Sequence, residues 1–453
     1  MARYGVWLVG ARGGLATTLQ VGSRAIVRRL CSRSGLAVER PSLLAQGLPA
    51  LEELRFGGHD IRSGPLVDGA FEIYRRNGSL RYEVIDALRG DLGEIEREIR
   101  PGVLVNAGEA IERIANPSHV RREKSLADTV NALSGDIQSF RDREAPDGVV
   151  LVNLSSTEPE IPLSDPALAD PAALADAIAA DRTDLVRSST LYSLAAVRAG
   201  VPVINFTPSN ACLVPAVRKL AEDAGLPYMG NDGKTGETLV KSALAPMFKY
   251  RNLRVLSWQG YNMLGDRDGE ILADARNKAS KVRSKDSLLS KILGYPLHTK
   301  VEIDYVPSLD DLKTAWDFIH FQGFLDYKMS MQFTWQGCDA ILAAPLVLDM
   351  ARMALLARNR GEKGPMRQLA CFFKDPLGVE EQDLHRQFHL FLQYLGEADD
   401  EDGHGGGPCG GPVRLVAAEP EAEPKTPPTT TKTTVTPLPS SPPAASKSRK
   451  EKA

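Results

Sequence analysis

Residues 5–18 read GVWLVGARGGLATT, and this stretch decides the fold. The apolar run Gly5–Val9 predicts a β-strand and the residues after the last glycine predict a helix, so Gly10 and Gly13 lie in the turn between them. Glycines in such a turn let the backbone approach a pyrophosphate at the helix N-terminus, as in dinucleotide-binding folds. The spacing G-x-x-G-x-x-A departs from that motif, because Arg12 takes the place of the middle glycine. On its own, the motif does not decide between a dinucleotide site and a plain turn.

Apolar, β-rich runs alternate with helical stretches through the first half of the chain. Further strands are predicted at 103–106, 149–153 and 201–205, the last after a helix at 191–199. This alternation predicts a parallel sheet with crossover helices. Two strands run into polar loops, residues 153–158 (NLSSTE) and 205–210 (NFTPSN). Since ligands of open α/β sheets bind outside the carboxyl ends of strands, these loops are candidates for a cofactor cleft, although ordinary turn chemistry also explains them.

A second glycine-rich turn, Gly230–Thr238 (GNDGKTGET), leads into helix-forming sequence. The first N–H groups of a helix lack partners within it and lie at the positive end of its dipole, so such a turn can bind phosphate. The residues Gly233-Lys234-Thr235 match the end of a nucleotide P-loop. That motif requires another glycine five residues before Gly233, where this chain has Tyr228. The turn is therefore either a phosphate site outside the P-loop class or an ordinary helix start.

Three lysines, Lys278, Lys281 and Lys285, have the spacing of one helix face if residues 273–293 form a helix. Ammonium groups that repel one another are typical of a solvated surface. The alternative is an anion pocket in which at least one lysine has a lowered pKa and acts as a base.

The composition is that of an enzyme with more than one domain. The 453 residues are 43% hydrophobic and 25% charged, and the net charge of −3 gives no electrostatic reason to expect a nucleic-acid partner. The five cysteines show no C-x-x-C spacing, which favours a reducing compartment, so we expect a cytoplasmic protein. No apolar run reaches the roughly 18 residues that span a bilayer, and the N-terminus has no targeting pattern, so no membrane partner is expected.

The end of the chain, residues 397–453, differs in composition. An acidic run at 397–402 is followed by a glycine cluster and by sequence rich in Pro, Thr and Ser. Such a segment buries too little apolar surface to offset the entropy lost on ordering, so we predict a disordered tail.

The motifs, in their order along the chain, resemble those of the myo-inositol-phosphate synthases, NAD-dependent enzymes that cyclise glucose 6-phosphate. The resemblance covers roughly residues 5 to 395. Besides the two glycine turns and the 205–210 loop, it includes residues 261–269 (YNMLGDRDG), the Ser-Lys steps at 280–281 and 284–285, residues 311–313 (DLK), Cys338-Asp339 and residues 369–377 (LACFFKDPL).

The resemblance implies a reaction without net redox change. In the family, NAD oxidises C5 of the open-chain sugar phosphate, a proton leaves C6, the enolate attacks the C1 aldehyde, and the NADH just formed reduces the resulting ketone. The positions that match the family's catalytic residues are Lys281, Lys285, Lys313, Lys374, Asp232 and Asp339. The expected roles are proton transfer at C5 for Lys281, contacts near the C1 aldehyde and phosphate for Lys285 and Lys374, and a contact with the phosphate or C6 for Lys313.

Further contacts carry over in the same way. The residues implied for the cofactor are Gly10, Arg12, Gly13, Gly14, Leu15, Ala16, Asp60, Ser155, Thr157, Asn205, Thr207, Pro208 and Asp232. Those implied for the substrate phosphate are Thr235, Gly236, Glu237, Thr238 and Lys313, and those implied for the rest of the substrate are Asn262, Leu264, Asp266 and Asp268. Some members use a divalent cation near the phosphate, but the sequence offers no dedicated ligand cluster. The pair His385 and His389 lacks the Glu of a metal motif and is interpreted as a helix-surface pair.

Two positions depart from the family pattern. Glu237 stands where the family usually has Gln, which puts a carboxylate beside a dianionic phosphate, so we expect its side chain to point away or to pair with a lysine. Asp266-Arg267 replaces the usual Asn-Asn, and this change puts the identity of the substrate in doubt more than the fold or the cofactor.

The predicted fold is α/β. A doubly wound, Rossmann-like NAD-binding domain occupies residues 1–238, an inserted α+β catalytic and oligomerisation domain 239–340, a return segment 341–396, and the disordered tail 397–453. Because the family is typically tetrameric, a homotetramer is expected. Two other functions stay open: an NAD oxidoreductase acting on a related sugar phosphate, and a catalytically silent NAD-binding sensor or scaffold. The four matching lysines favour an enzyme, whereas Asp266-Arg267 favours the silent protein.

Overall fold

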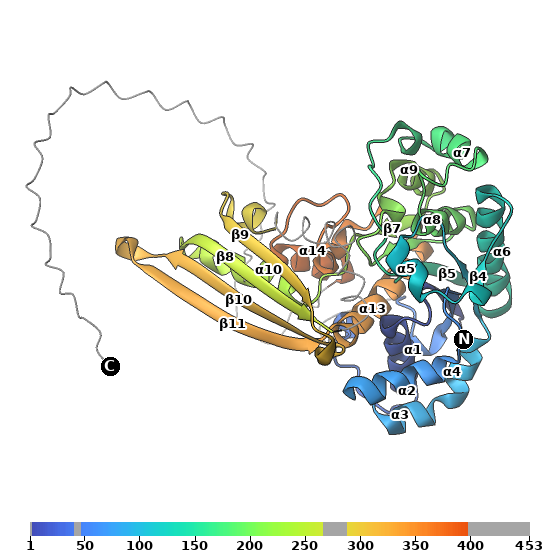
Figure 1. Cartoon of the computed structure of the whole chain (residues 1–453), viewed down its shortest axis with the longest axis horizontal. Coiled ribbons are helices and arrows are strands. Elements are labelled where there is room, and N and C mark those ends of the chain that lie inside the picture. Colours follow the sequence, from blue (N-terminus) through green and yellow to red (C-terminus); the bar gives the residue numbers. More distant parts are fainter. Residues whose placement is uncertain (1, 40–46, 266–287, 397–453) are drawn as a thin grey trace, which may run out of the picture. The chain divides into compact units, whose positions relative to one another are not determined.

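The computed structural model describes residues 2–39, 47–265 and 288–396. Two sheets organise this part of the chain (Figure 1). The larger has eight strands in the order β12-β7-β6-β5-β1-β2-β3-β4, and all its neighbouring strands pair in parallel. Its strands are β1 (Tyr4–Val9), β2 (Leu54–Asp60), β3 (Ile99–Val103), β4 (Val120–Arg121), β5 (Gly148–Asn153), β6 (Val203–Asn205), β7 (Pro227–Met229) and β12 (Gly364–Pro365).

Both faces of the larger sheet are buried, as the central strand β1 shows. Successive side chains of a strand point to opposite faces, so Val6 and Leu8 enter one hydrophobic core and Trp7 and Val9 the other. The first core also contains side chains of α1 (Gly14–Val27), α2 (Leu66–Asn77), α3 (Tyr82–Ala87), α4 (Arg89–Glu96), α13 (Asp339–Asn359) and α14 (Leu384–Leu395). The second contains side chains of α6 (Leu126–Glu144), α7 (Pro171–Ala179), α8 (Ser188–Arg198) and α9 (Pro215–Asp223). Helices on both faces of a parallel sheet confirm the predicted doubly wound fold.

Helix α13 returns the chain to the larger sheet after the second sheet is complete. Among the described residues it is the one helix whose length and apolar composition would allow it to cross a membrane, and 72% of that apolar window is buried inside the fold. Its side chains Val347, Met350 and Ala354 are fully buried in the first core. Burial in the core therefore explains the apolar composition of α13.

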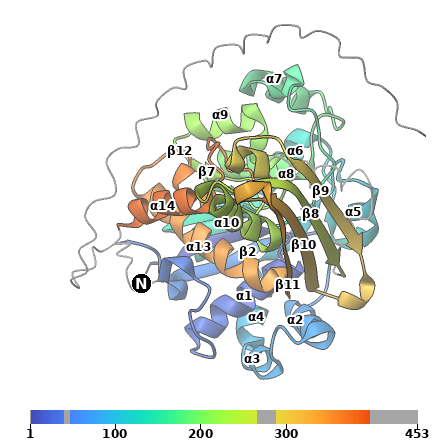
Figure 2. The ribbon, with the colours of Figure 1, turned by 90° about the vertical axis from the view of Figure 1, so that its left-hand side faces the viewer.

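The second sheet has four strands in the order β11-β10-β8-β9, which lie side by side in Figure 2. They are β8 (Arg254–Leu264), β9 (His298–Tyr305), β10 (Leu312–Gln322) and β11 (Lys328–Cys338). Strand β10 is antiparallel to β8 and β11, whereas β8 and β9 are parallel. Helix α10 (Gly236–Tyr250) packs on one face, where Phe248 contacts the rings of Trp258 and Phe321.

One predicted strand is shifted by the structure. The run 103–106 was expected as a strand, but β3 ends at Val103. Beyond that point the backbone N–H of Val105 donates to Ser188 Oγ, and the Val105 carbonyl accepts from the Ser188 N–H. The start of α8 therefore takes the hydrogen bonds that a strand ladder would have used. Helix α5 (Glu109–Ile114) follows this segment.

Candidate active site

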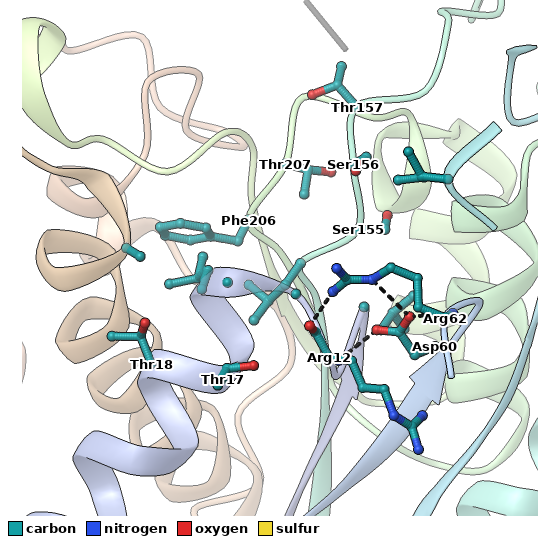
Figure 3. Close-up of a pocket in the computed structure, with 18 of the residues that line it drawn as sticks. Arg12, Thr17, Thr18, Asp60, Arg62, Ser155, Ser156, Thr157, Phe206 and Thr207 are labelled. Carbon is teal, nitrogen blue, oxygen red and sulfur yellow. Dashed lines mark hydrogen bonds and ion pairs between the residues drawn. The ribbon is translucent and has the colours of Figure 1, made fainter. Parts of the chain in front are cut away.

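A cavity of about 670 Å³ lies at the carboxyl ends of β1, β2, β5 and β6. That volume is typical of small-molecule sites, and the edge of the sheet is where open α/β folds bind their ligands. Residues from α10, β10 and α13 also line it, so both sheets contribute to one site. Figure 3 shows the part of this cavity around the end of β1.

The glycine turn after β1 forms one end of the cavity. Gly10 has φ +84, a conformation that favours glycine, and a Cβ there would lie 3.1 Å from the Leu154 carbonyl oxygen. Gly13 is the N-cap of α1 and provides no side-chain cap. At Gly14, which borders the cavity, a Cβ would meet no protein atom within 4 Å. The turn thus leaves open space beside the positive end of α1, as a pyrophosphate site requires.

Asp60 lies at the end of β2, and each of its two carboxylate oxygens accepts a hydrogen bond from a backbone N–H. Its Oδ2 accepts from the Arg12 N–H over 2.6 Å and its Oδ1 accepts from the Arg62 N–H over 2.8 Å (Figure 3). The Arg12 side chain donates to the Gly64 carbonyl in the loop after β2 and pairs with Glu96 at the end of α4. Arg12 therefore presents its backbone to the turn, while Arg62 lies across it and donates to the Arg12 carbonyl.

The loops after β5 and β6 line the next part of the cavity with Ser155, Thr157, Thr207 and Pro208. Asn205 lies behind this wall, where it is fully buried and donates to the Ser209 carbonyl and to Asn231 Oδ1. Of the other residues predicted for the cofactor, Gly10, Arg12, Gly13, Gly14, Leu15, Asp60 and Asp232 border the cavity, whereas Ala16 is buried outside its lining.

Glu158 holds these two loops in place. Its backbone N–H donates to Ser209 Oγ over 3.1 Å, and its carboxylate accepts from the N–H and the hydroxyl of Ser189 at the start of α8. Burial raises the pKa of Glu158 to about 7, against the opposing effect of the Ser189 hydrogen bonds. The side chain is fully enclosed and borders the cavity.

Asp232, in the loop between β7 and α10, and Lys374, in the return segment, form an ion pair on the cavity wall. Lys374 Nζ donates to Asp232 Oδ1 over 2.8 Å, and both side chains are largely buried. Asp232 has φ +60, and its Oδ2 has no hydrogen-bond partner in the described residues. A buried oxygen without a partner is costly in a protein interior, so its position on the cavity wall indicates a polar ligand.

A second lysine–carboxylate pair lines the same cavity. Lys313 Nζ, from β10, donates to Asp339 Oδ2 over 3.1 Å, and Thr235 Oγ1 donates to Asp339 Oδ1 over 3.4 Å. Thr235 is the N-cap of α10, and Gly236 follows with φ +51. The start of α10 therefore lies beside Lys313, as a phosphate site requires.

The prediction for Glu237 is confirmed, because its carboxylate pairs with a lysine. Glu237 Oε1 lies 2.5 Å from Lys241 Nζ, and Oε2 accepts from Asn262 Nδ2 over 2.7 Å. Of the other residues predicted for the phosphate, Thr235, Thr238 and Lys313 border the cavity together with Glu237, and Gly236 does not.

The structure does not bring every predicted substrate residue to the cavity. Asn262 is buried against Glu237, and Leu264 packs with Ile303 in a small separate cluster, so neither is part of the cavity lining. The predicted residues Lys281, Lys285, Asp266 and Asp268 lie outside the described residues, as does Lys278.

Sequence reasoning missed Arg62, Thr18 and Lys241, and it included Glu158 only as the last residue of the 153–158 loop. For Arg62 the available signal was its position two residues after Asp60, and for Lys241 it was the helical spacing from Glu237. Thr18 gave no signal, because its burial beside the cavity follows from long-range packing.

The described residues fit NAD. The glycine turn offers space and a helix N-terminus for the pyrophosphate, and Asp60 lies where an adenine ribose is held in such folds. Two buried oxygens on the wall, Thr18 Oγ1 and Asp232 Oδ2, have no hydrogen-bond partner among the residues that the structure describes. In the described part of the chain, no group of three or more His, Cys, Asp or Glu side chains is placed to hold a metal ion. The pair His385 and His389 lies on α14, where His389 Nε2 is 2.9 Å from Gln393 Nε2.

Comparisons with known proteins point to one family. The family model described as myo-inositol-1-phosphate synthase matches residues 42–395. The inositol-3-phosphate synthase 1 of Bacteroides thetaiotaomicron is 31% identical over 416 residues, which cover 87% of this chain and 95% of that protein.

Solved structures show the same fold. The crystal structure of inositol-3-phosphate synthase from Caenorhabditis elegans matches with a TM-score of 0.78 and 22% identity, over 89% of this chain and 88% of that one. A myo-inositol-1-phosphate synthase-related protein from Thermotoga maritima matches with a TM-score of 0.69 and 21% identity, over 87% of this chain and 98% of that one. With a family model that covers most of its length and a relative that it matches nearly end to end, this chain belongs to the myo-inositol-1-phosphate synthase family.

Proposed function

We propose that this protein catalyses the NAD-dependent cyclisation of D-glucose 6-phosphate to a myo-inositol phosphate, as an isomerase. The observation that carries the proposal is the convergence on one cavity of the glycine turn, the start of α10 and the pairs Lys374–Asp232 and Lys313–Asp339. An NAD site, a phosphate site and two positioned ammonium groups are the parts that this reaction needs. The family and the relative nearly a third identical support the same activity.

NAD bound at the glycine turn supplies the chemistry of accepting a hydride from the sugar and returning it. The chain's own residues hold both ligands so that this exchange stays within one binding event. Gly10, Gly13 and Asp60 hold the cofactor's pyrophosphate and ribose, and Thr235 and Thr238 at the start of α10 hold the sugar phosphate.

The lysines stabilise negative charge that develops on the sugar oxygens. Lys374 is 9% exposed and its ammonium is held by Asp232, so it meets a developing oxyanion without reorganising. Lys313 is oriented by Asp339 beside the α10 N-terminus, where it contacts the phosphate or C6. The remaining predicted lysines, Lys281 and Lys285, complete the set in this proposal, with Lys281 moving the proton at C5.

We also propose a homotetramer assembled through the second sheet. The face of this sheet turned away from α10 carries the rings of Tyr261, Trp316 and Phe318, which contact one another in a row. At the β10–β11 turn, Phe324 is 88% and Leu325 82% exposed. Apolar surface of this kind is typical of an interface between protein chains.

We propose that the protein is located in the cytoplasm. The described cysteines Cys31, Cys212, Cys338 and Cys371 are all free thiols, which supports a reducing compartment.

The test of the activity is to incubate the purified protein with glucose 6-phosphate and NAD and to identify the products by mass spectrometry and NMR. Formation of an inositol phosphate with catalytic amounts of NAD is expected. Accumulation of an oxidised sugar phosphate and NADH in equal amounts would instead identify an ordinary oxidoreductase.

A further inference from the structure

Glu237 and Lys241 form a buried ion pair at the start of α10. Lys241 Nζ lies 2.5 Å from Glu237 Oε1, and the two side chains are 3% and 0% exposed. Glu237 borders the cavity, whereas Lys241 is not part of its lining. The ammonium thus lies behind the carboxylate as seen from the ligand site.

The second sheet is shaped to receive this carboxylate. A Cβ on Gly260 of β8 would lie 2.1 Å from Glu237 Oε1 and 2.9 Å from Lys241 Nζ, so the pair occupies the space left by a missing side chain. Asn262, two residues further along β8, donates to the other oxygen of Glu237. Glu237 is therefore directed to the sheet by contacts on both carboxylate oxygens.

Lys241 is shared with a second carboxylate deeper in the sheet. Its Nζ lies 3.7 Å from Asp317 Oδ1 and 6.0 Å from the centre of the Trp258 ring. Trp258 Nε1 donates to the same Asp317 oxygen over 2.6 Å. The sheet thus holds the ammonium in place from the side opposite the cavity.

A carboxylate at the first turn of α10 opposes the attraction that the helix N-terminus offers to a phosphate, because like charges in a poorly solvated site repel strongly. An ammonium beside it cancels most of this repulsion. We propose that Lys241 is a positioning residue of the phosphate site: by pairing with Glu237 it holds that carboxylate against the second sheet and offsets its charge, so that the start of α10 accepts a dianionic phosphate. The inference rests on the proposed function in taking this turn as the phosphate site.

The test measures binding of glycerol 3-phosphate, a phosphate monoester that cannot be cyclised, to the NAD-loaded full chain by calorimetry. Lys241→Met should raise its Kd by at least about tenfold, since it leaves the Glu237 charge unpaired beside the ligand. Lys241→Arg, which keeps the charge, should stay within about threefold of the wild type. The matched control is Lys249→Met, which removes an exposed lysine from the same helix and should leave the Kd unchanged.

The double variant Glu237→Gln/Lys241→Met separates charge compensation from direct contact. Its Kd should lie within about threefold of that of Glu237→Gln alone, because the carboxylate that borders the cavity is then absent. Asp317, the second carboxylate beside Lys241, is not part of the cavity lining. A loss of tenfold or more in this comparison would overturn the proposal. The comparison also holds if Lys241→Met fails to fold, since neither of these two proteins contains the unpaired Glu237 carboxylate.

The charge of the ligand gives a readout that a merely structural role would not change. Phosphate monoesters pass from monoanion to dianion around pH 6. The ratio of Kd between Lys241→Met and the wild type should therefore be larger about one unit above that pH than about one unit below it. A ratio that does not change with pH would contradict the proposal. Because binding is measured with a ligand that does not react, a protein that binds it but forms no inositol phosphate would refute the proposed function alone.

Discussion

Lys374 donates a hydrogen bond from Nζ to Asp232 Oδ1 over 2.8 Å, although the two residues are 142 positions apart in the sequence. Their backbones are joined as well, since the Lys374 N–H donates to the Asp232 carbonyl over 2.7 Å. The neighbouring residues Asn231 and Asp375 exchange two further backbone hydrogen bonds. These hydrogen bonds fix the chain that returns from the second sheet to the loop that precedes α10. The Lys374 ammonium is thereby held in one position at the cavity.

Lys374→Met should slow cyclisation while leaving NAD affinity and folding close to normal. Loss of one charged donor to a developing oxyanion costs on the order of 3 to 4 kcal/mol in the barrier. The measurement is the single-turnover rate, with NAD affinity measured in parallel. The matched control is Lys363→Met, an exposed lysine in the same return segment. A variant that kept more than about a tenth of the wild-type rate, equivalent to about 1.4 kcal/mol, would show that Lys374 does not act on the reacting sugar.

Gly13→Val should weaken NAD binding. A Cβ at this position already lies 3.0 Å from the Gly10 carbonyl oxygen, and the branches of valine would extend further into the turn that approaches the pyrophosphate. NAD affinity by calorimetry is the measurement. Gly22→Ala is the control, because a Cβ there meets nothing within 4 Å and the site lies in the interior of α1. Equal NAD affinity in folded Gly13→Val and wild-type protein would remove the glycine turn from the cofactor site.

The sequence predicted the strand–turn–helix unit at the N-terminus, the parallel sheet and the helix after residue 235, because each depends on local periodicity and on glycine positions. It misplaced the strand at 103–106, since nothing local indicates that Ser188 will take the hydrogen bonds of Val105. The strand is not formed there because segments far apart in the chain pack against each other.

The residues that line the cavity could be predicted only in part, because Asn262 and Leu264 are not among them. The pairing of the residues could not be predicted. Resemblance supplied Lys313, Asp339, Lys374 and Asp232, but the partnership of each lysine depends on how the second sheet and α13 return to the first. For Glu237 the physical argument was sufficient, because a carboxylate at a phosphate site must be neutralised or directed away. Its partner Lys241 has the i,i+4 spacing of a helical pair, whereas the space at Gly260 became visible only in the structure.

Asp349 should make the stability of the fold depend on pH. Burial in α13 raises its pKa from 3.8 to about 7, against the opposing effects of Arg352 and the N–H groups of Ala37 and Val38, while Glu39 adds to the rise. Between pH 3.8 and about 7, Asp349 is therefore protonated in the folded protein and ionised in the unfolded chain. The free energy of unfolding falls as the pH rises through this interval, and the loss persists above pH 7.

Asp349→Asn removes this titration. The free energy of unfolding of the variant minus that of the wild type should be larger at pH 8 than at pH 5. Each unit of difference between the folded and unfolded pKa of Asp349 is worth about 1.4 kcal/mol. Urea unfolding at both pH values is the measurement. If the difference between the two proteins is the same at both, the folded carboxyl titrates at its ordinary pKa.

Deletion of residues 397–453 should leave folding, assembly and chemistry intact, because a segment of this composition supplies no hydrophobic core. The measurements are the thermal midpoint, the mass in solution and the turnover number of the shortened protein. A large fall in the midpoint, or loss of assembly, would show that this segment docks on the rest of the chain.

The most direct test of the proposed function follows the hydride. A cyclase of this kind takes the hydride from C5 and returns it to the same carbon before the cofactor leaves, so glucose 6-phosphate deuterated at C5 should give inositol phosphate that keeps the label, without accumulation of NADH. Transfer of the label to the free nicotinamide pool, or NADH formed in step with the substrate consumed, would contradict the account.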